Sequence, residues 1–266
     1  MKRVIIAAAA AALLALAVPA SPVGAQATTD VYAVHGLNLA GQSAPGGTAV
    51  TVCAGDAEID PSFEFGDVIG PLPRPSGVEV SLQVYPAEGE DCAEPATEPL
   101  IDQTVTPTGA AVTLVATAFG NPLVPELLPF PIDLSCVDPG NGGAVAAHAA
   151  NAPLVDVVNT TLGFSVGEIS YGERIVGQLP AGDYDIEIFE VDGPPDPAMS
   201  FTVPVTAGNT TIGYAVGNQP SEGPTPLVLI PQVIPVGTCE TPPTTAAPTT
   251  APPAAAPATA QPSFTG

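Results

Sequence analysis

The chain contains only two histidines, His35 and His148, and these are the first residues to consider as catalytic bases or metal ligands. A histidine titrates near neutral pH and its ring nitrogens bind zinc, so either role suits the residue type. Both histidines end similar segments, residues 31–35 and 144–148. A single catalytic site does not need a copy in each half of a chain. We therefore expect structural histidines at strand ends, hydrogen-bonded to a loop, with metal ligation as the alternative.

Two acidic loops offer a second kind of chemistry. Glu88, Glu90 and Asp91 follow one predicted strand, and Asp192 and Asp196 follow the equivalent strand of the second half. Such oxygen-rich loops can bind Ca²⁺, although this spacing matches no EF-hand, and paired carboxylates can also hydrolyse glycosides. Trp is absent and aromatic residues make up 5% of the chain, which disfavours a sugar-stacking cleft. We expect solvated turns, with a Ca²⁺ or small-ligand site in these loops as the alternative and a secreted hydrolase third.

No set of Ser, His and Asp can be assembled from motif spacing into a catalytic triad. We therefore assign no catalytic residue and no cofactor, and expect a protein that is not an enzyme.

Four cysteines complete the reactive residues: Cys53, Cys92, Cys136 and Cys239. They are widely spaced without a C-x-x-C pair, which argues against a zinc site or a redox dithiol. In an exported chain they predict two disulfides, for which three pairings are possible. We favour Cys53–Cys92 within the first half, which leaves Cys136–Cys239 flanking the second half.

The charge distribution excludes several partners. The formal net charge is −23, and a basic start (Lys2, Arg3), an apolar run and a small-residue cleavage site predict a signal peptide over residues 1–25. Its removal leaves Arg74 and Arg174 as the only lysine or arginine residues. Nucleic acid and anionic membranes bind through such cations, and Schiff-base chemistry needs a lysine. We expect a secreted, extracellular chain without an integral membrane segment after signal removal, with cell-wall association as an alternative.

The elements that would position these residues are short strands. After an expected turn at residues 179–182, in which Gly182 would take a positive φ, residues 183–188 alternate acidic and apolar, as in a half-buried strand. The alternation slips near Phe189, which predicts a bulge or the strand end there. An equivalent turn at 72–77 precedes a similar strand at 78–85.

The rest of the chain repeats the same order of strands. Further strands are predicted at 31–35, 49–53, 100–106 and 111–119, and again at 144–148, 154–158, 199–205 and 210–216. Residues 54–70, 86–99 and 120–136 are predicted as loops or Pro-rich connections. No segment after the signal has helical periodicity, and short strands with regular turn signals indicate sandwiches.

The predicted fold class is all-β, with two tandem Ig-like or transthyretin-like β-sandwich domains. Repeat 1 would span residues 28–137 and repeat 2 residues 144–239, and residues 240–266 form a Pro/Thr/Ala-rich disordered stalk. Such stalks are typical of secreted actinobacterial proteins, in which the threonines can carry sugars.

The repeat resembles the family called domain of unknown function 4397. The resemblance rests on residues 145–153, 155–157, 171–172, 179–186 and 206–216, and it covers 144–218 well and 31–121 loosely. It implies exported bacterial β-sandwich modules, often tandem and at the cell surface, with no known reaction. We expect a non-enzymatic adhesion, scaffold or interaction module whose partner is an envelope or extracellular protein or glycan.

Overall fold

The computed structural model describes residues 27–37, 49–86, 89–218 and 227–240. The predicted signal peptide, Glu88 and the stalk from residue 241 lie outside these residues. Within them, every helix or strand element is a strand, and no helix is long and apolar enough to cross a membrane.

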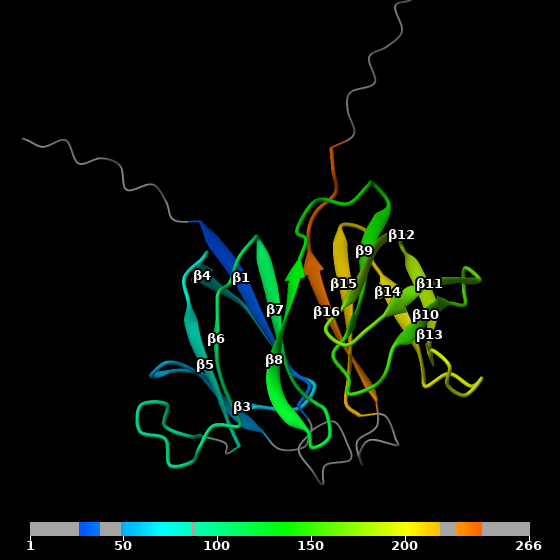
Figure 1. The fold of residues 1–266 in the computed structure, drawn as a ribbon. Helices are drawn as coiled ribbons and strands as arrows, with labels where there is room; N and C mark the ends of the chain where they lie inside the picture. The colour runs from blue at the N-terminus through cyan, green and yellow to red at the C-terminus, as the bar shows by residue number, and fades with distance from the viewer. Residues whose placement is uncertain (1–26, 38–48, 87–88, 219–226, 241–266) are drawn as a thin grey trace, which may run out of the picture.

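Each half of the chain contributes eight strands (Figure 1). The first half comprises β1 (Thr28–His35), β2 (Val50–Ala54), β3 (Ala57–Phe63), β4 (Val68–Pro75), β5 (Val80–Tyr85), β6 (Ile101–Val105), β7 (Ala111–Phe119) and β8 (Val124–Ile132). The second comprises β9 (Asn141–His148), β10 (Val155–Asn159), β11 (Phe164–Ile169), β12 (Arg174–Pro180), β13 (Gly182–Glu190), β14 (Met199–Val205), β15 (Asn209–Val216) and β16 (Val228–Pro235).

The two halves have the same topology. The first forms sheets β4-β1-β7-β8 and β3-β2-β5-β6, and the second forms β12-β9-β15-β16 and β11-β10-β13-β14. In each half the first strand pairs in parallel with the seventh, so that His35 lies opposite Ala116 and His148 opposite Ala215. The all-β sandwich fold predicted from the sequence is confirmed, and this register fixes which residues of the two halves are equivalent.

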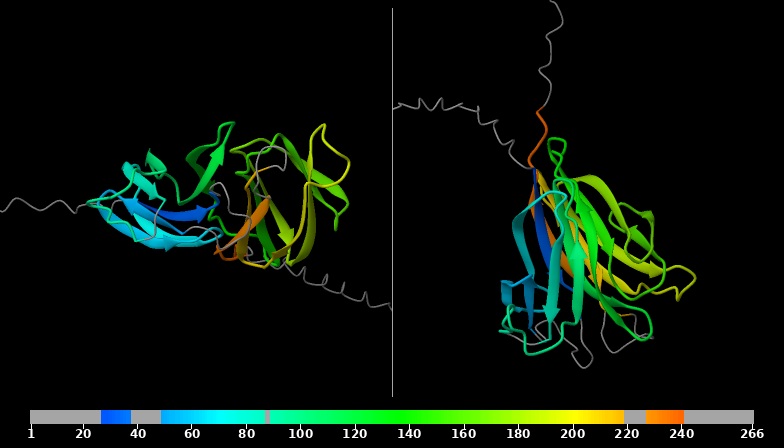
Figure 2. Two further views of the ribbon diagram at one scale, coloured as in Figure 1. Left: turned by 90° about the horizontal axis from the view of Figure 1, so that it is seen from below. Right: turned by 60° about the vertical axis from the view of Figure 1, so that its left-hand side comes forward.

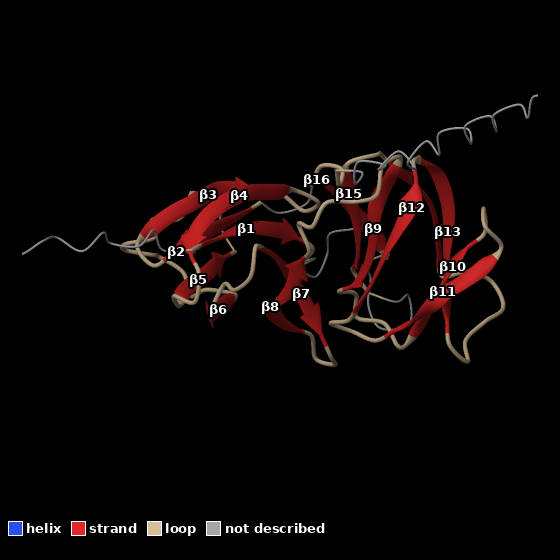
Figure 3. Ribbon diagram, turned by 90° about the horizontal axis from the view of Figure 1, so that it is seen from above, coloured by secondary structure: helices blue, strands red, loops and turns tan. Residues whose placement is uncertain are grey.

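The two sandwiches share a central core between sheets β4-β1-β7-β8 and β12-β9-β15-β16, which face each other in Figure 3. The views in Figure 2 also place β16 between the first half and the rest of the second. The buried residues of this central core are Tyr32, Val34, Phe65, Ala111, Val115, Phe130, Ile132, Ala147, Ala149, Ile212, Tyr214, Val216, Ile230 and Ile234. Two outer cores lie inside the individual sandwiches. The inner sheets are therefore covered on both faces.

Polar contacts fix the relative position of the two inner sheets. Gln232 Oε1 accepts hydrogen bonds from Thr113 Oγ1 (3.0 Å) in the other half and from Tyr214 Oη (2.8 Å). At the edge of the central core, the ring of Tyr171 stacks on Phe119 with centroids 4.0 Å apart. Such directional contacts between buried or half-buried groups select one arrangement of the sandwiches.

Both disulfides have the favoured pairing. Cys53–Cys92 closes a loop of the first half, and Cys136–Cys239 joins the segment before β9 to the segment after β16. Disulfides of this kind indicate an oxidising, extracytoplasmic compartment.

The prediction of loops and turns was wrong in three places, and β11, β12 and β16 were not predicted as strands. Residues 54–70 contain β3 and the start of β4, and the expected turn at 72–77 is strand as far as Pro75. The Pro-rich segment 120–136 contains β8. Proline is tolerated in β8 because this strand lies at the edge of its sheet. Pro125, Pro129 and Pro131 lie an even number of positions apart, so their missing N–H groups would all lie on the side away from β7.

Strand β13 also differs in detail from its prediction. Gly182 does not have a positive φ and is the first residue of β13, so the chain turns at Ala181. Pairing continues to Glu190 without a register shift, which makes the change of pattern near Phe189 a strand end rather than a bulge. Ile186 is buried as expected, whereas Glu187 is half-buried.

The shared core predicts that the two sandwiches lose stability together. Ile212→Ala should lower the free energy of unfolding by about 2–5 kcal/mol, because it empties part of the central core. Hydrogen exchange should accelerate in β1 and β7 of the first half as well as in β15. Ile188→Ala, in the outer core of the second half, is the control and should act mainly there. Unchanged exchange in β1 and β7 on Ile212→Ala would contradict the coupling.

Candidate functional site

The two histidines occupy equivalent, buried positions at the ends of β1 and β9. Each is 1% exposed, and each backbone N–H donates to the turn before the fourth strand, His35 to Asp67 O (3.0 Å) and His148 to Glu173 O (2.9 Å). The ring of His35 lies 5.4 Å, between centroids, from that of Phe63. Both side chains thus belong to the packing of their own sandwich.

The His148 ring joins β9 to the loop that follows it. Nε2 lies 3.0 Å from the carbonyl oxygen of Pro153, and Nδ1 accepts the N–H of Ala150 (3.3 Å). Because Nδ1 is an acceptor, the proton sits on Nε2 and the ring is neutral. Burial lowers the pKa of His148, although the Pro153 carbonyl opposes this effect. A neutral ring with both nitrogens bonded to the loop acts structurally.

The acidic loop residues do not converge. Glu90 is 8% exposed and its Oε1 accepts the backbone N–H groups of Ala96 and Thr97, while Asp91 Oδ1 accepts that of Ala93 (3.0 Å). Asp192, which has a positive φ of 63°, and Asp196 lie exposed in the turn after β13. In the described ranges no group of three or more His, Cys, Asp or Glu is arranged to hold a metal ion.

One segment has a spacing that sequence reasoning passed over. Residues 163–167 read Gly-Phe-Ser-Val-Gly, the G-x-S-x-G spacing of a nucleophile elbow. Such an elbow needs a sharp strand-to-helix turn, whereas Ser165 lies in the edge strand β11 and its hydroxyl donates to Asp156 Oδ1 (2.5 Å). The backbone around Ser165 therefore lacks the geometry that exposes a catalytic serine.

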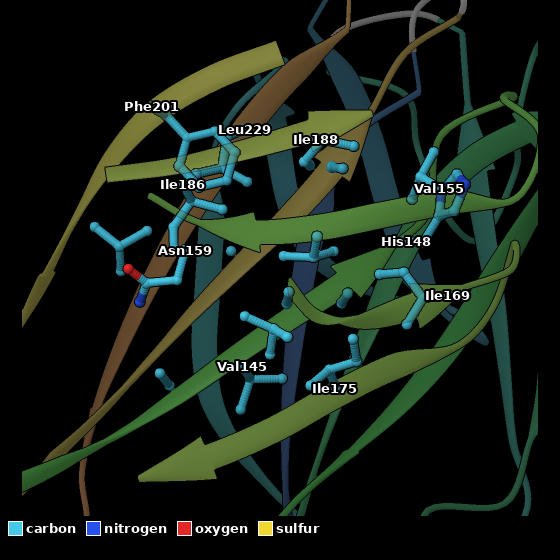
Figure 4. Close-up of a pocket in the computed structure, with 18 of the residues that line it drawn as sticks. Val145, His148, Val155, Asn159, Ile169, Ile175, Ile186, Ile188, Phe201 and Leu229 are labelled. Atoms are coloured by element: carbon cyan, nitrogen blue, oxygen red, sulfur yellow. The ribbon is translucent and has the colours of Figure 1, made fainter. Parts of the chain in front are cut away.

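An apolar cavity lies between the two sheets of the second sandwich (Figure 4). It has a volume of about 120 Å³. Its wall on the inner sheet is made of Ala144 and Ala146 from β9 with Gly213 and Ala215 from β15, and larger aliphatic side chains such as Ile186 and Ile188 form the opposite wall. Three of the described lining residues have polar side chains: His148, Asn159 and Tyr184.

The small residues of the inner wall are specific to the second sandwich. From the strand register, Ala144 takes the place of Val31, Gly213 that of Leu114 and Gly177 that of Leu72. The corresponding space in the first sandwich is about 40 Å³ and is lined by the three larger residues. The topology alone therefore does not produce the larger cavity. The smaller side chains of Ala144 and Gly177 leave space there, whereas Leu229 covers Gly213, where an added Cβ would lie 2.9 Å from its side chain.

The cavity is lined in part by exposed residues of the edge strands β11 and β12. Phe164 (48% exposed) and Val166 (40% exposed) on β11 line it and also contact solvent. Gly177 on β12 also lines it, and a Cβ added there would meet no atom within 4 Å. An apolar molecule could therefore enter between these two strands without displacing a strand of either sheet.

Comparisons with known proteins add little to this geometry. No protein-family model matches the chain and no curated protein is similar to it in sequence, so the motif resemblance to domain of unknown function 4397 gains no support there. A solved structure, "The Bacillus anthracis TIE protein", is 13% identical with a TM-score of 0.22 and covers 72% of this chain. The match spans 34% of that protein, and at this TM-score we draw no conclusion from it.

The bonds of Glu90 predict a local stabilising role. Glu90→Ala should lower the free energy of unfolding by roughly 1 kcal/mol, because the backbone N–H groups of Ala96 and Thr97 lose a charged acceptor that is itself buried. Chemical denaturation with the disulfides intact measures the effect. Glu94→Ala, at an exposed position in the same loop, is the matched control and should be nearly neutral. An equal loss of stability in the Glu90→Ala and Glu94→Ala variants would refute the stabilising role of Glu90.

The buried His148 ring predicts a pH dependence of stability. Its pKa is lowered from the ordinary value of 6.5, so as pH falls below about 6.5 the unfolded state takes up a proton that the folded state resists. Stability should therefore decrease as pH falls from about 7.5 to 5.5, more steeply in the wild type than in His148→Gln. Denaturation at several pH values tests this, and equal slopes in the two proteins would contradict it.

Proposed function

We propose that the chain is an exported, non-enzymatic interaction module of the cell envelope or surrounding medium, which binds an envelope or extracellular protein. The observation that carries the proposal is the single body formed by two sandwiches across a shared central core. A body of this kind presents fixed surfaces to a partner without an internal hinge. The two disulfides and the predicted signal peptide support export.

The course of the strands supports presentation at one end. Strand β1 begins, and β16 finishes, at the same end of the body (Figures 1 and 2). The chain therefore leaves toward the predicted stalk from that end. The opposite end is the one where β1, β7, β9 and β15 finish (Figure 1), and it would point away from the envelope if the stalk were attached there.

The opposite end carries exposed apolar side chains. Phe119 at the end of β7 is 39% exposed, Val124 at the start of β8 is 61% exposed, and Leu154 in the loop after β9 is 36% exposed. The loops that hold them are joined by a hydrogen bond from Gly120 N–H to Asn151 Oδ1 (3.1 Å). Exposed apolar residues on fixed loops favour a protein partner, and the low aromatic content disfavours a glycan.

The chemistry of the described residues supports a role without catalysis. The His148 ring is bonded to its own loop, and Glu90 and Asp91 bond to backbone N–H groups of their own loop. The motif resemblance to domain of unknown function 4397 points the same way, because that family implies exported surface modules with no known reaction.

The test is binding of the purified mature protein to envelope fragments from the producing cells. We expect saturable binding that is lost when the fragments are treated with protease. The double variant Val124→Glu/Leu154→Glu should bind at least tenfold more weakly, because it places charge on the exposed apolar end. Val233→Glu is the matched control, since Val233 is 55% exposed on β16, away from these loops.

Three results would overturn the proposal. The first is recovery of the protein only from the cytoplasm after cell fractionation. The second is an absence of saturable binding to either envelope fragments or the proteins of the medium. The third is binding that survives protease treatment of the fragments, which would assign a glycan partner instead.

A further inference from the structure

We propose that the cavity of the second sandwich, between β9 and β15 on one side and β10, β13 and β14 on the other, is a binding site for a small neutral hydrophobe. The ligand would be an aromatic ring, or an alkyl chain of about six carbons with an uncharged polar end. This site is separate from the acidic loops and from the exposed residues of the far end, and the inference does not depend on the proposed function.

The size of the cavity sets the size of the ligand. Its volume of about 120 Å³ is close to that of apolar protein cavities of about 150 Å³ that stay dry and bind benzene. The lining side chains are almost entirely aliphatic or alanine, so water inside would find few hydrogen-bond partners. A hydrocarbon group gains contacts that water cannot supply.

The first sandwich shows that the fold can fill this space. Val31, Leu114 and Leu72 occupy the positions of Ala144, Gly213 and Gly177 and leave a space of about 40 Å³. Unfilled volume destabilises a core, so a chain selected for stability alone would tend to fill it. Ala144 and Gly177 instead leave space in the second sandwich, while the side chain of Leu229 covers Gly213.

The way in is also built from small or exposed residues. Phe164 and Val166 on β11 stand partly in solvent while lining the cavity, and Gly177 on β12 leaves open space where a side chain would stand. Both strands are at the edges of their sheets, so an entrance there would lie between two strands that have no further neighbour in their sheets. The polar end of a ligand would remain at this entrance.

The charges favour a neutral ligand. No Asp, Glu, Lys or Arg is among the described residues that line the cavity. Arg174, on β12, directs its guanidinium to the carbonyl of Pro131 in the first half. Arg74, the other cation of the described chain, belongs to the first sandwich. A ligand carboxylate would therefore lose its hydration in an apolar space with no cation directed toward it.

The experiment uses the mature two-sandwich protein with its disulfides formed and titrates it with benzene, 1-hexanol or hexanoate. Methyl NMR should show saturable shifts for Ala146 and Ile186, which line the cavity, and none for Ala33 and Ile59 in the first sandwich. Benzene and 1-hexanol should bind, and hexanoate should bind at least tenfold more weakly.

Matched variants connect binding to the cavity. Ala144→Val and Gly177→Leu introduce the residues that the first sandwich already accommodates, and together they should weaken binding of 1-hexanol at least tenfold. Ala198→Val, a same-sized change in an exposed loop, should bind as the wild type does. The single Ala144→Val variant serves if the double variant is not folded, and it should show a smaller loss of the same kind.

Three outcomes would overturn the proposal. If no probe shifts the Ala146 and Ile186 methyl signals at saturation, the cavity is a packing void. If the filled variants gain thermal stability but bind 1-hexanol as tightly as the wild type, binding occurs elsewhere. If hexanoate binds as tightly as 1-hexanol, the preference for a neutral ligand is wrong.

Discussion

Burial of the central strands β7 and β15 on both faces is the constraint on which the rest of the molecule depends. In an isolated antiparallel sandwich each sheet has one apolar and one solvated face. Here β7 is buried from Ala111 to Ala118, and β15 is buried at most positions, because each sheet packs against its own sandwich and against the other half. The strands at the centre of the molecule therefore cannot carry the charged residues that make the outer strands soluble.

The same constraint explains how large and small side chains are distributed along β15. Successive residues of a strand face opposite sides, so Ile212, Tyr214 and Val216 point into the central core while Gly213 and Ala215 face the cavity of the second sandwich. The large side chains thus strengthen the contact between the sandwiches. On the other face, Gly213 gives room to the side chain of Leu229, which also lines the cavity. In β7 the equivalent of Gly213 is Leu114, and the first sandwich is filled.

The sequence was sufficient for the strands that alternate or are continuously apolar, and for the disulfide pairing. It missed β3, β4, β8, β11, β12 and β16, all of which are edge strands. In β4 and β8 the prolines read as loop signals, although an edge strand tolerates them. The central core was not predicted, since an apolar run such as β7 does not reveal what covers its second face. The cavity was missed for a related reason: Ala144 and Gly213 look ordinary until the register pairs them with Val31 and Leu114.

Polar residues in the interior act mainly by holding backbone segments that lack strand partners. His148 binds the carbonyl of Pro153 and the N–H of Ala150, Glu90 binds the N–H groups of Ala96 and Thr97, and Gln232 joins the two inner sheets through Thr113. Each buried polar group therefore satisfies backbone or side-chain partners that would otherwise be costly to bury. Because these groups are engaged in structure, recognition is left to surfaces and spaces that are apolar. The exposed residues at the far end and the cavity of the second sandwich are such places, and they lie in different parts of one coupled body.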